Sequence, residues 1–247
     1  MMMTTADTDN NRIPARSAPV LFKEETASTN TELKDRAAGM PHGTVLWSLR
    51  QTAGRGRSGR SFVSPYGGLY YSMLLMYPAP DERLTAATPL AALAVVRALR
   101  TVCGMDAQIK WPNDILCGSK KLCGILTEST IGAEGMQMIV GIGINVNTRE
   151  FPGLPEDTAC SVFTETGRIT NIAELAGELT LELDRAFARL PETDPEDISE
   201  YRGRCCTLGR KISRGGTAVR IDDDFALVTV LPDGTERRIY FGEIFQE

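Results

Sequence analysis

Histidine is almost absent from this chain of 247 residues, in which His42 is the single example. A histidine-rich metal site is therefore impossible. No Cys-x-x-Cys pair occurs either, although there are six cysteines, at positions 103, 117, 123, 160, 205 and 206. This spacing is not typical of zinc ligands. We therefore interpret the cysteines as small, buried, apolar side chains.

Long apolar runs, an export signal and an excess of positive charge are also missing. No apolar run approaches the ~20 residues of a membrane helix, so we expect no membrane partner. Residues 1–17 are polar and do not resemble a signal peptide, which predicts a cytoplasmic protein with reduced cysteines. The 27 Lys and Arg against 32 Asp and Glu give a net charge of -5, which argues against nucleic-acid binding as the main function.

The order of apolar and polar residues predicts an α/β domain followed by a small β domain. We expect a disordered leader at 1–17, a first domain at 18–200 and a second at 201–247. Periodicity predicts strands at 20–23, 44–49, 69–76, 108–111, 121–128 and 136–146, and helices at 31–38, 86–102 and 171–190. After residue 205 the strands become short and turns such as Asp233-Gly234 separate them, which is typical of a small barrel.

The segment 51–60, QTAGRGRSGR, interleaves three glycines with Arg55, Arg57 and Arg60. Glycine lets backbone amides approach a ligand, and arginine offers forks of donors that match carboxylate and phosphate. We favour an anion-binding loop over a simple solvated loop. RNA contact is weakly supported because no aromatic residues are interleaved, and the spacing is not that of a Walker loop.

Three other segments allow both a functional and a plain interpretation. In Lys110-Trp111-Pro112-Asn113-Asp114, the amide and carboxylate suit magnesium bound with substrate phosphates, but also an ordinary turn. Lys121 opens an apolar strand, where its ammonium can face an internal anion or solvent. The glycines at 141 and 143 can admit a flat ring against the backbone, with Asn145 reading ring nitrogens, although the dinucleotide-binding continuation is missing.

These motifs, in this order and together with Ser28-Thr29-Asn30 and 121–126 (KLCGIL), resemble the catalytic module of biotin–protein ligases. The resemblance covers about residues 20–247, and the closing Gly242-Glu243-Ile244 is similar to the end of the family's C-terminal barrel. It implies an α/β (α+β) fold, with a catalytic domain like that of class II aminoacyl-tRNA synthetases and a small C-terminal SH3-like β-barrel.

The resemblance also implies chemistry in two steps, with ATP and biotin as substrates and Mg²⁺ as cofactor. The biotin carboxylate attacks the ATP α-phosphate to give biotinyl-5'-adenylate, and a lysine of a biotin carboxyl carrier domain then takes the biotinyl group. No enzyme nucleophile is needed, so catalysis depends on positioning and fixed positive charge. A monomer or weak homodimer is implied.

Site residues follow from matching positions in the motifs. The resemblance assigns catalysis to Lys121, Arg57 and Arg55. It assigns biotin binding to Ser28, Thr29, Asn30, Gln51, Gly54, Arg55, Gly56, Arg57, Lys121 and Gly124. It assigns ATP and adenylate binding to Arg57, Arg60, Lys110, Asn113, Asp114, Lys121 and Asn145, with Asp114 as the magnesium ligand and Asn145 as an adenine contact.

Two departures from the family pattern matter. Phe62 stands where members often have tryptophan, so an indole donor is lost. The leader before Ser28 is too short for the winged helix-turn-helix of some members, so we expect a monofunctional ligase that binds no DNA. The alternatives are a lipoyl or octanoyl ligase, a biotin-sensing transcriptional regulator, and a ligand-binding module without turnover.

Overall fold

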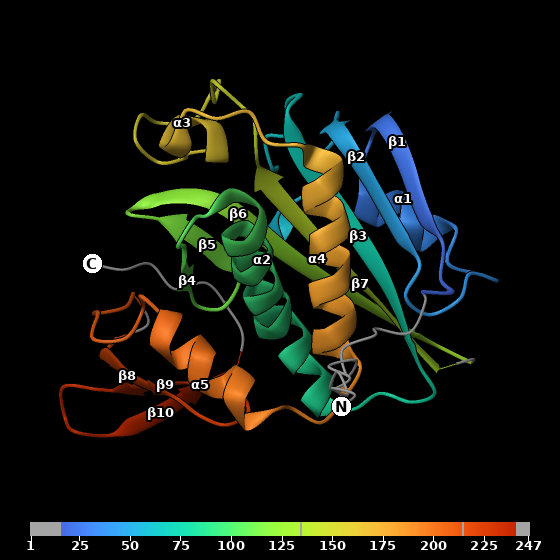
Figure 1. The fold of residues 1–247 in the computed structure, drawn as a ribbon. Coiled ribbons are helices and arrows are strands. Elements are labelled where there is room, and N and C mark those ends of the chain that lie inside the picture. The colour runs from blue at the N-terminus through green and yellow to red at the C-terminus, as the bar shows by residue number, and fades with distance from the viewer. Residues whose placement is uncertain (1–15, 134, 214, 241–247) are drawn as a thin grey trace, which may run out of the picture.

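A computed structural model describes residues 16–133, 135–213 and 215–240, and its largest feature is a seven-stranded sheet (Figure 1). Its strands run in the spatial order β1-β2-β3-β7-β6-β5-β4. The first pair is parallel and the others are antiparallel. The bounds are β1 (Val20–Thr26), β2 (Val45–Gln51), β3 (Gly68–Tyr77), β4 (Gln108–Lys110), β5 (Asp114–Cys117), β6 (Lys120–Gly132) and β7 (Gly135–Asn145).

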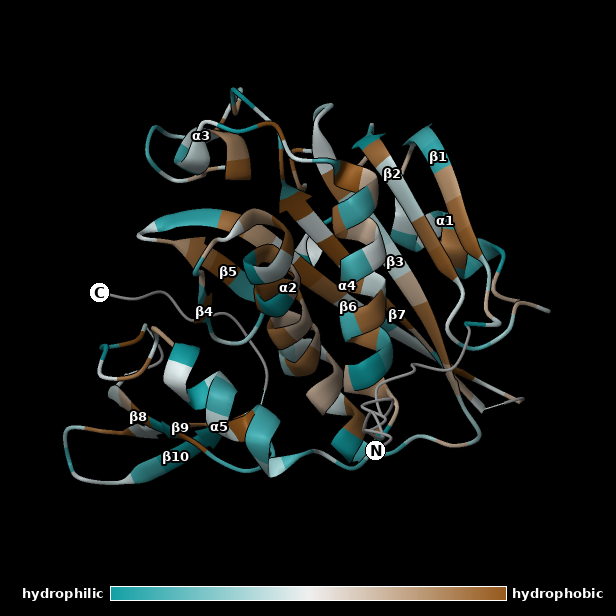
Figure 2. Cartoon of the chain, in the orientation of Figure 1, coloured by the Kyte–Doolittle hydropathy of each residue, from teal (hydrophilic) through white to brown (hydrophobic). Residues whose placement is uncertain are grey.

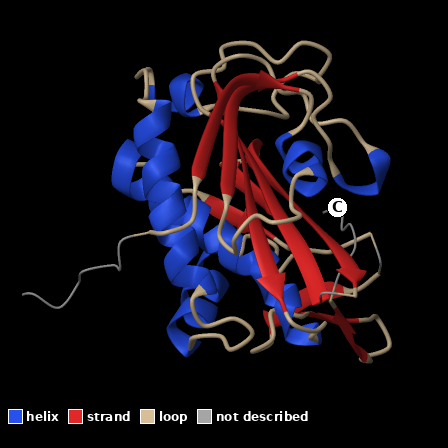
Figure 3. Ribbon diagram, turned by 90° about the vertical axis from the view of Figure 1, so that its right-hand side faces the viewer, coloured by secondary structure: helices blue, strands red, loops and turns tan. Residues whose placement is uncertain are grey.

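Helices cover both faces of this sheet (Figure 3). On one face α4 (Ile172–Phe187) packs against β3, whose alternate residues such as Tyr71 and Met73 enter the main core. Beside it, α2 (Ala87–Cys103) packs against β5, β6 and β7. On the other face α1 (Thr29–Asp35) packs its Leu33 against β2, β3 and β7. The period of two along a strand and 3.6 along a helix produces this arrangement, because each element presents one apolar face to its neighbour.

Figure 2 shows hydrophobic residues along the strands of the large sheet and along α2, with hydrophilic residues alternating along α4. The stretch 82–103, which joins the 3-10 helix η2 (Glu82–Ala86) to α2, is long and apolar enough by composition to cross a membrane. This differs from the expectation of no such run. Two thirds of the stretch are buried, 67%, so its apolar residues serve the protein core.

The C-terminal part consists of α5 (Pro195–Arg204) and an antiparallel sheet of β8 (Thr217–Ile221), β9 (Leu227–Val230) and β10 (Glu236–Ile239). The expected domain boundary at residue 200 falls inside α5. Three strands are described, so the SH3-like barrel stays a prediction, and 242–244 lie outside the described residues.

Two short elements were not predicted, namely β5 and α3 (Val162–Thr166). Residues 111–113 form a turn, as one of the two interpretations of the Pro-Asn-Asp sequence predicted, and Asp114 then begins a strand that pairs with β4 and β6. A four-residue strand carries too little periodicity to be recognised from sequence alone.

Candidate active site

A cavity of about 330 Å³ opens on the face of the sheet that carries α1. Its floor is formed by backbone at two cross-strand pairs of β6 and β7, Gly124 with Gly143 and Leu126 with Gly141. Its walls are the start of α1, the end of β2, the loop of residues 52–67 and the residues around 110–114. The motifs singled out in the sequence therefore meet at one place although they are far apart along the chain.

One end of the cavity is lined by buried, uncharged polar groups. Thr29 donates from its backbone N–H and its hydroxyl to Oε1 of Gln51, at 2.9 and 3.2 Å. Ser28 caps α1, since its Oγ accepts a hydrogen bond from Thr31 N at 3.4 Å. Ser28 and Thr29 are 4% and 3% exposed, and these bonds to neighbouring protein groups hold their polar atoms in place.

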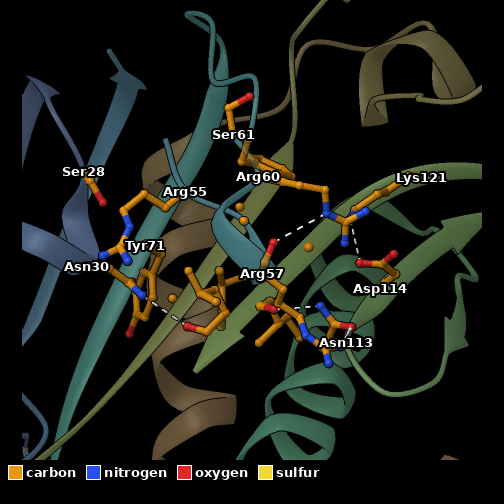
Figure 4. Close-up of a pocket in the computed structure, with 18 of the residues that line it drawn as sticks. Ser28, Asn30, Arg55, Arg57, Arg60, Ser61, Tyr71, Asn113, Asp114 and Lys121 are labelled. Carbon is orange, nitrogen blue, oxygen red and sulfur yellow. Dashed lines mark hydrogen bonds and ion pairs between the residues drawn. The ribbon is translucent and has the colours of Figure 1, made fainter. Parts of the chain in front are cut away.

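Asn30 lies at the same end and is fixed in one orientation. Its Nδ2 donates to the Leu126 carbonyl at 3.2 Å and to Oε2 of Glu128 at 3.1 Å, and its Oδ1 accepts from the Ser72 hydroxyl at 2.6 Å. A Cβ at Gly141 would lie 2.1 Å from Asn30 Oδ1, so only glycine leaves room for this side chain. Figure 4 shows Asn30 at the edge of the pocket with its bond to β6.

The Gly-Arg loop closes over the cavity and is attached to its walls by two arginines. Arg57 donates to Oδ1 of Asn113 at 2.7 Å, and Asn113 is in turn bonded through Nδ2 to the Ile125 carbonyl at 2.9 Å. Arg55 forms an ion pair with Glu128 on β6. The segment also contains a single turn of 3-10 helix, η1 (Arg57–Gly59), rather than being loop throughout.

Lys121 and its neighbour Lys120 have different environments. The ammonium of Lys121 lies 2.6 Å from Oδ1 of Asp114, among the residues that line the cavity (Figure 4). Lys120 instead pairs at 2.7 Å with Asp157, whose side chain is 81% exposed, and the hydrogen bond to this aspartate raises the pKa of Lys120. Of the two lysines, Lys121 is therefore the one that lines the cavity, as predicted.

A flat ring does lie against the glycine pair of the floor, but it belongs to the protein. A Cβ at Gly143 would come 2.6 Å from the Phe62 ring, and one at Gly124 would come 3.2 Å from it. The ammonium of Lys121 lies 5.8 Å from the centre of the same ring. Phe62 therefore keeps the packing role of an aromatic residue here and adds a cation–π contact.

The charges around the cavity are strongly unbalanced. Five cationic side chains line it: Arg55, Arg57, Arg60, Lys110 and Lys121. Among the described residues, Asp114 is the one carboxylate in the lining. Such a surface favours a polyanion, because each opposite charge within a few ångströms lowers its electrostatic energy.

The cysteines take no part in this chemistry. All six are free, and burial raises the pKa of several of the thiols, to about 12 for Cys160 and further for Cys123. In the part of the chain that the structure describes, no three His, Cys, Asp or Glu side chains gather as a metal site. Cys123, Cys160 and Cys205 are buried, as predicted, whereas Cys103, Cys117 and Cys206 are half-buried, which differs from the prediction.

Most of the predicted site residues line the cavity; the exceptions are Gly54 and Asn145. A Cβ at Gly54 would lie 2.4 Å from the Phe62 carbonyl, so this glycine allows the loop to fold back on itself. Asn145 is 5% exposed and donates to the Cys160 carbonyl at 2.9 Å. Its side chain ties the end of β7 to the chain near Cys160, and the adenine contact stays a prediction.

Two contributors were not predicted. Ser72 and Glu128 orient Asn30 from strands β3 and β6, as described above. Both residues lie on the same face as Gly141 because of strand alternation and register. No local motif in the sequence predicts this arrangement.

Comparison with known proteins relates the chain to enzymes that attach cofactors to proteins. Residues 22–145 match the biotin/lipoate A/B protein ligase family. A biotin–[acetyl-CoA-carboxylase] ligase of Paracoccus denitrificans is 35% identical over 238 residues, which cover 88% of this chain and 98% of the relative. A bifunctional ligase/repressor of Bacillus spizizenii is 37% identical over 166 residues, 66% of this chain and 50% of the relative. The chain thus spans about half the length of that relative.

The fold is also found in solved structures. The biotin protein ligase of Aquifex aeolicus in complex with biotin and ATP superposes with a TM-score of 0.80 at 29% identity, over 92% of this chain and 98% of that one.

Proposed function

This chain belongs to the biotin/lipoate A/B protein ligase family, and we propose that it joins biotin to a protein lysine at the expense of ATP. The observation that carries the proposal is the division of one cavity into two chemically different ends. Uncharged, buried hydrogen-bonding groups gather around Thr29, with Arg55 beside them (Figure 4). The other cations of the lining are Arg57, Arg60, Lys110 and Lys121, and they surround the side of Asp114. Biotin is divided in the same way, with a neutral ureido ring at one end and a carboxylate at the other.

The uncharged end suits the ureido ring. Ser28, Thr29 and Gln51 offer hydroxyl and amide groups, and an amide-like ring needs donors and acceptors together. Leu126 lines the cavity on the same face of β6 as Gly124 and offers apolar contact to the carbon chain of biotin. Gly56 in the loop and Gly124 in the floor are proposed to let the backbone come close to the ligand.

The cationic end suits the first step. The biotin carboxylate oxygen attacks the α-phosphorus of ATP, a new C–O–P linkage forms, and the bond to pyrophosphate breaks. Negative charge must meet negative charge, so Lys121 and Arg57 lower the barrier by holding positive charge where the phosphate oxygens gain charge. The catalytic role proposed for Arg55 acts through the loop, because its guanidinium pairs with Glu128 at the Asn30 end of the cavity. Arg60, Lys110 and Asn113 are proposed contacts to ATP.

The second step needs less positive charge. The neutral amine of an acceptor lysine attacks the carbonyl carbon of the adenylate, a C–N bond forms, AMP leaves and the amine releases a proton. We propose a biotin carboxyl carrier domain as acceptor, as the name of the Paracoccus relative suggests. The expected cytoplasmic location, the absence of a DNA partner and a monomer or weak homodimer belong to this proposal.

Asp114 is the residue that fits magnesium. Mg²⁺ is bound in proteins through one or two carboxylates together with substrate phosphates, and Asp114 with the adjacent amide of Asn113 offers such oxygen ligands. When bound there, the ion would offset phosphate charge. In the structure the Asp114 carboxylate pairs with Lys121, which holds it in place.

The test is exchange of labelled pyrophosphate into ATP, run separately with biotin, lipoate and octanoate. Lipoate and octanoate have no ureido ring, so each hydrogen bond that they fail to make with Ser28, Thr29 or Gln51 should cost about 0.5–1.5 kcal/mol. We expect exchange that depends on biotin and is at least tenfold weaker with the other two acids. Equal exchange with lipoate would overturn the biotin assignment in favour of a lipoyl or octanoyl ligase.

A further inference from the structure

Glu128 lies outside the residues that line the cavity, yet it joins two of the elements that enclose it. It follows Gly124 and Leu126 at a spacing of two along β6, so all three side-chain positions face the same side of the sheet. Its carboxylate contacts Arg55 of the Gly-Arg loop and Asn30 of α1. A single acidic side chain therefore connects the loop, the helix and the floor.

The contact with Arg55 has the geometry of a two-pronged ion pair. Nη2 of Arg55 lies 3.0 Å from Oε1 of Glu128, and Nη1 lies 3.3 Å from Oε2. The Nη1 contact is a hydrogen bond and the Nη2 contact is an ion pair, and together they limit the direction of the guanidinium as well as its distance. Because the backbone of residue 55 bridges to residue 61, this contact holds the base of the loop against β6.

The strength of the pair suits a contact that opens and closes. The Arg55 side chain is 49% exposed and that of Glu128 is 20% exposed, so water and salt screen the attraction. The second attachment, Arg57 to Asn113, involves groups proposed to contact substrate. Of these two attachments, the Glu128 contact is thus the one made by a residue outside the cavity lining.

From these observations we propose that Glu128 is a positioning residue that keeps the Gly-Arg loop closed and thereby sets how long the biotinyl-adenylate stays bound. This rests on the proposed function, because it concerns the intermediate of that reaction. Loss of the pair should free the loop without removing any group from the cavity lining. The adenylate should then escape faster before an acceptor arrives.

Glu128→Gln separates the ion pair from the neighbouring hydrogen bond. Glutamine keeps an oxygen that accepts from Asn30, so the orientation of Asn30 is preserved while the charge facing Arg55 is lost. Glu25→Gln is the matched control. Glu25 pairs with Arg50 at 2.7 Å, is 40% exposed and lies outside the cavity.

The measurement is the rate at which chemically made, labelled biotinyl-adenylate leaves the enzyme when no acceptor is present. We expect release from Glu128→Gln to be about 3- to 10-fold faster than from wild type, the range for losing one two-pronged exposed pair. Glu25→Gln should release at the wild-type rate. At about 1 M salt, where the Debye length is about 3 Å, the ratio of release from Glu128→Gln to release from wild type should fall toward one. Both rates should rise, because salt also screens the cations around the anionic adenylate.

A double-mutant cycle with Arg55→Gln then tests whether the pair acts as a unit. The effect of Glu128→Gln on release should largely disappear when Arg55 is already replaced. The proposal would be overturned if Glu128→Gln and Arg55→Gln each multiplied the release rate by the same factor in the double variant as alone. A faster release from Glu25→Gln than from wild type would also overturn it. If wild type makes no biotinyl-adenylate from biotin and ATP, the proposed function itself is wrong. If it does, and release from Glu128→Gln is unchanged, only the role of Glu128 is wrong.

Discussion

Replacing Lys121 with methionine removes one positive charge from the cavity and keeps most of the side-chain volume. In the structure the Lys121 ammonium lies 2.6 Å from Asp114 Oδ1 and 5.8 Å from the centre of the Phe62 ring. Methionine can still contact the Phe62 ring. The variant therefore tests charge rather than packing, and its main effect should be on the step in which charge develops.

The size of the effect follows from the charges that remain. At an effective dielectric constant of about 20, two unit charges about 4 Å apart interact by roughly 4 kcal/mol. In other enzymes, removal of one preorganised donor from a site of developing charge costs about 2.7–4 kcal/mol. This cost is similar to the Coulomb energy given above. Without Lys121, the Asp114 carboxylate also lacks its partner in the structure and adds repulsion toward phosphate. We expect adenylate formation to slow by about 10²- to 10³-fold.

The assay compares the two half-reactions. Pyrophosphate exchange reports adenylate formation, and transfer from chemically made biotinyl-adenylate to a carrier domain reports the second step. Lys121→Met should slow the first far more than the second, because transfer begins from a neutral carbonyl and a neutral amine. Lys120→Met is the control, since Lys120 pairs with the exposed Asp157, and it should be nearly silent.

Two results would refute this reasoning. An equal loss in both half-reactions would mean that Lys121 binds the adenylate uniformly instead of favouring its formation. A larger loss of adenylate formation for Lys120→Met than for Lys121→Met would mean that Lys120, and not Lys121, supplies the functional ammonium.

Three further expectations concern packing, domain contact and pH. Gly143→Ala should lower kcat/KM for biotin about tenfold or more, because its methyl would lie 2.6 Å from the Phe62 ring and push the loop outward; wild-type kinetics would contradict this. Trp111→Phe should cost about 1–3 kcal/mol in urea unfolding, since the indole N–H bonds at 2.9 Å to a carbonyl of the C-terminal part; an unchanged unfolding midpoint would show that water replaces this bond. Burial alone would raise the pKa of Glu200, but hydrogen bonds from Arg97 and Arg204 lower it below 4.5. This carboxylate therefore stabilises the fold above pH 4.5 and ceases to do so as the pH falls through its lowered pKa. Glu200→Gln should destabilise the protein at pH 7 but not near pH 3, and equal destabilisation at both would contradict the assignment.

The sequence by itself predicted the element types well wherever periodicity was long. The helix expected at 86–102 is α2 (Ala87–Cys103), and the strand expected at 69–76 is β3 (Gly68–Tyr77). Both are rich in apolar residues over many positions, which makes the signal strong. The four-residue β5 and five-residue α3 were missed because a short element has almost no period to detect.

The motifs also indicated which residues share a site. Glycine and arginine in 51–60 predicted an anion-binding loop, and the loop indeed brings three arginines to the cavity. The chemistry of these side chains is a local property, so it can be read residue by residue. Their grouping came from the resemblance to a known family rather than from spacing.

Only the tertiary structure decided what contacts what. The glycines at 141 and 143 were expected to admit a ligand ring, but Asn30 and Phe62 occupy the space above them. Nothing near Glu128 in the sequence points to Arg55, 73 residues earlier, as its partner. Such contacts depend on strand register and on which face each side chain takes, and a shift of one residue would reverse every face. A sequence therefore determines the chemistry available to this protein, while the packing of distant segments decides where that chemistry is directed.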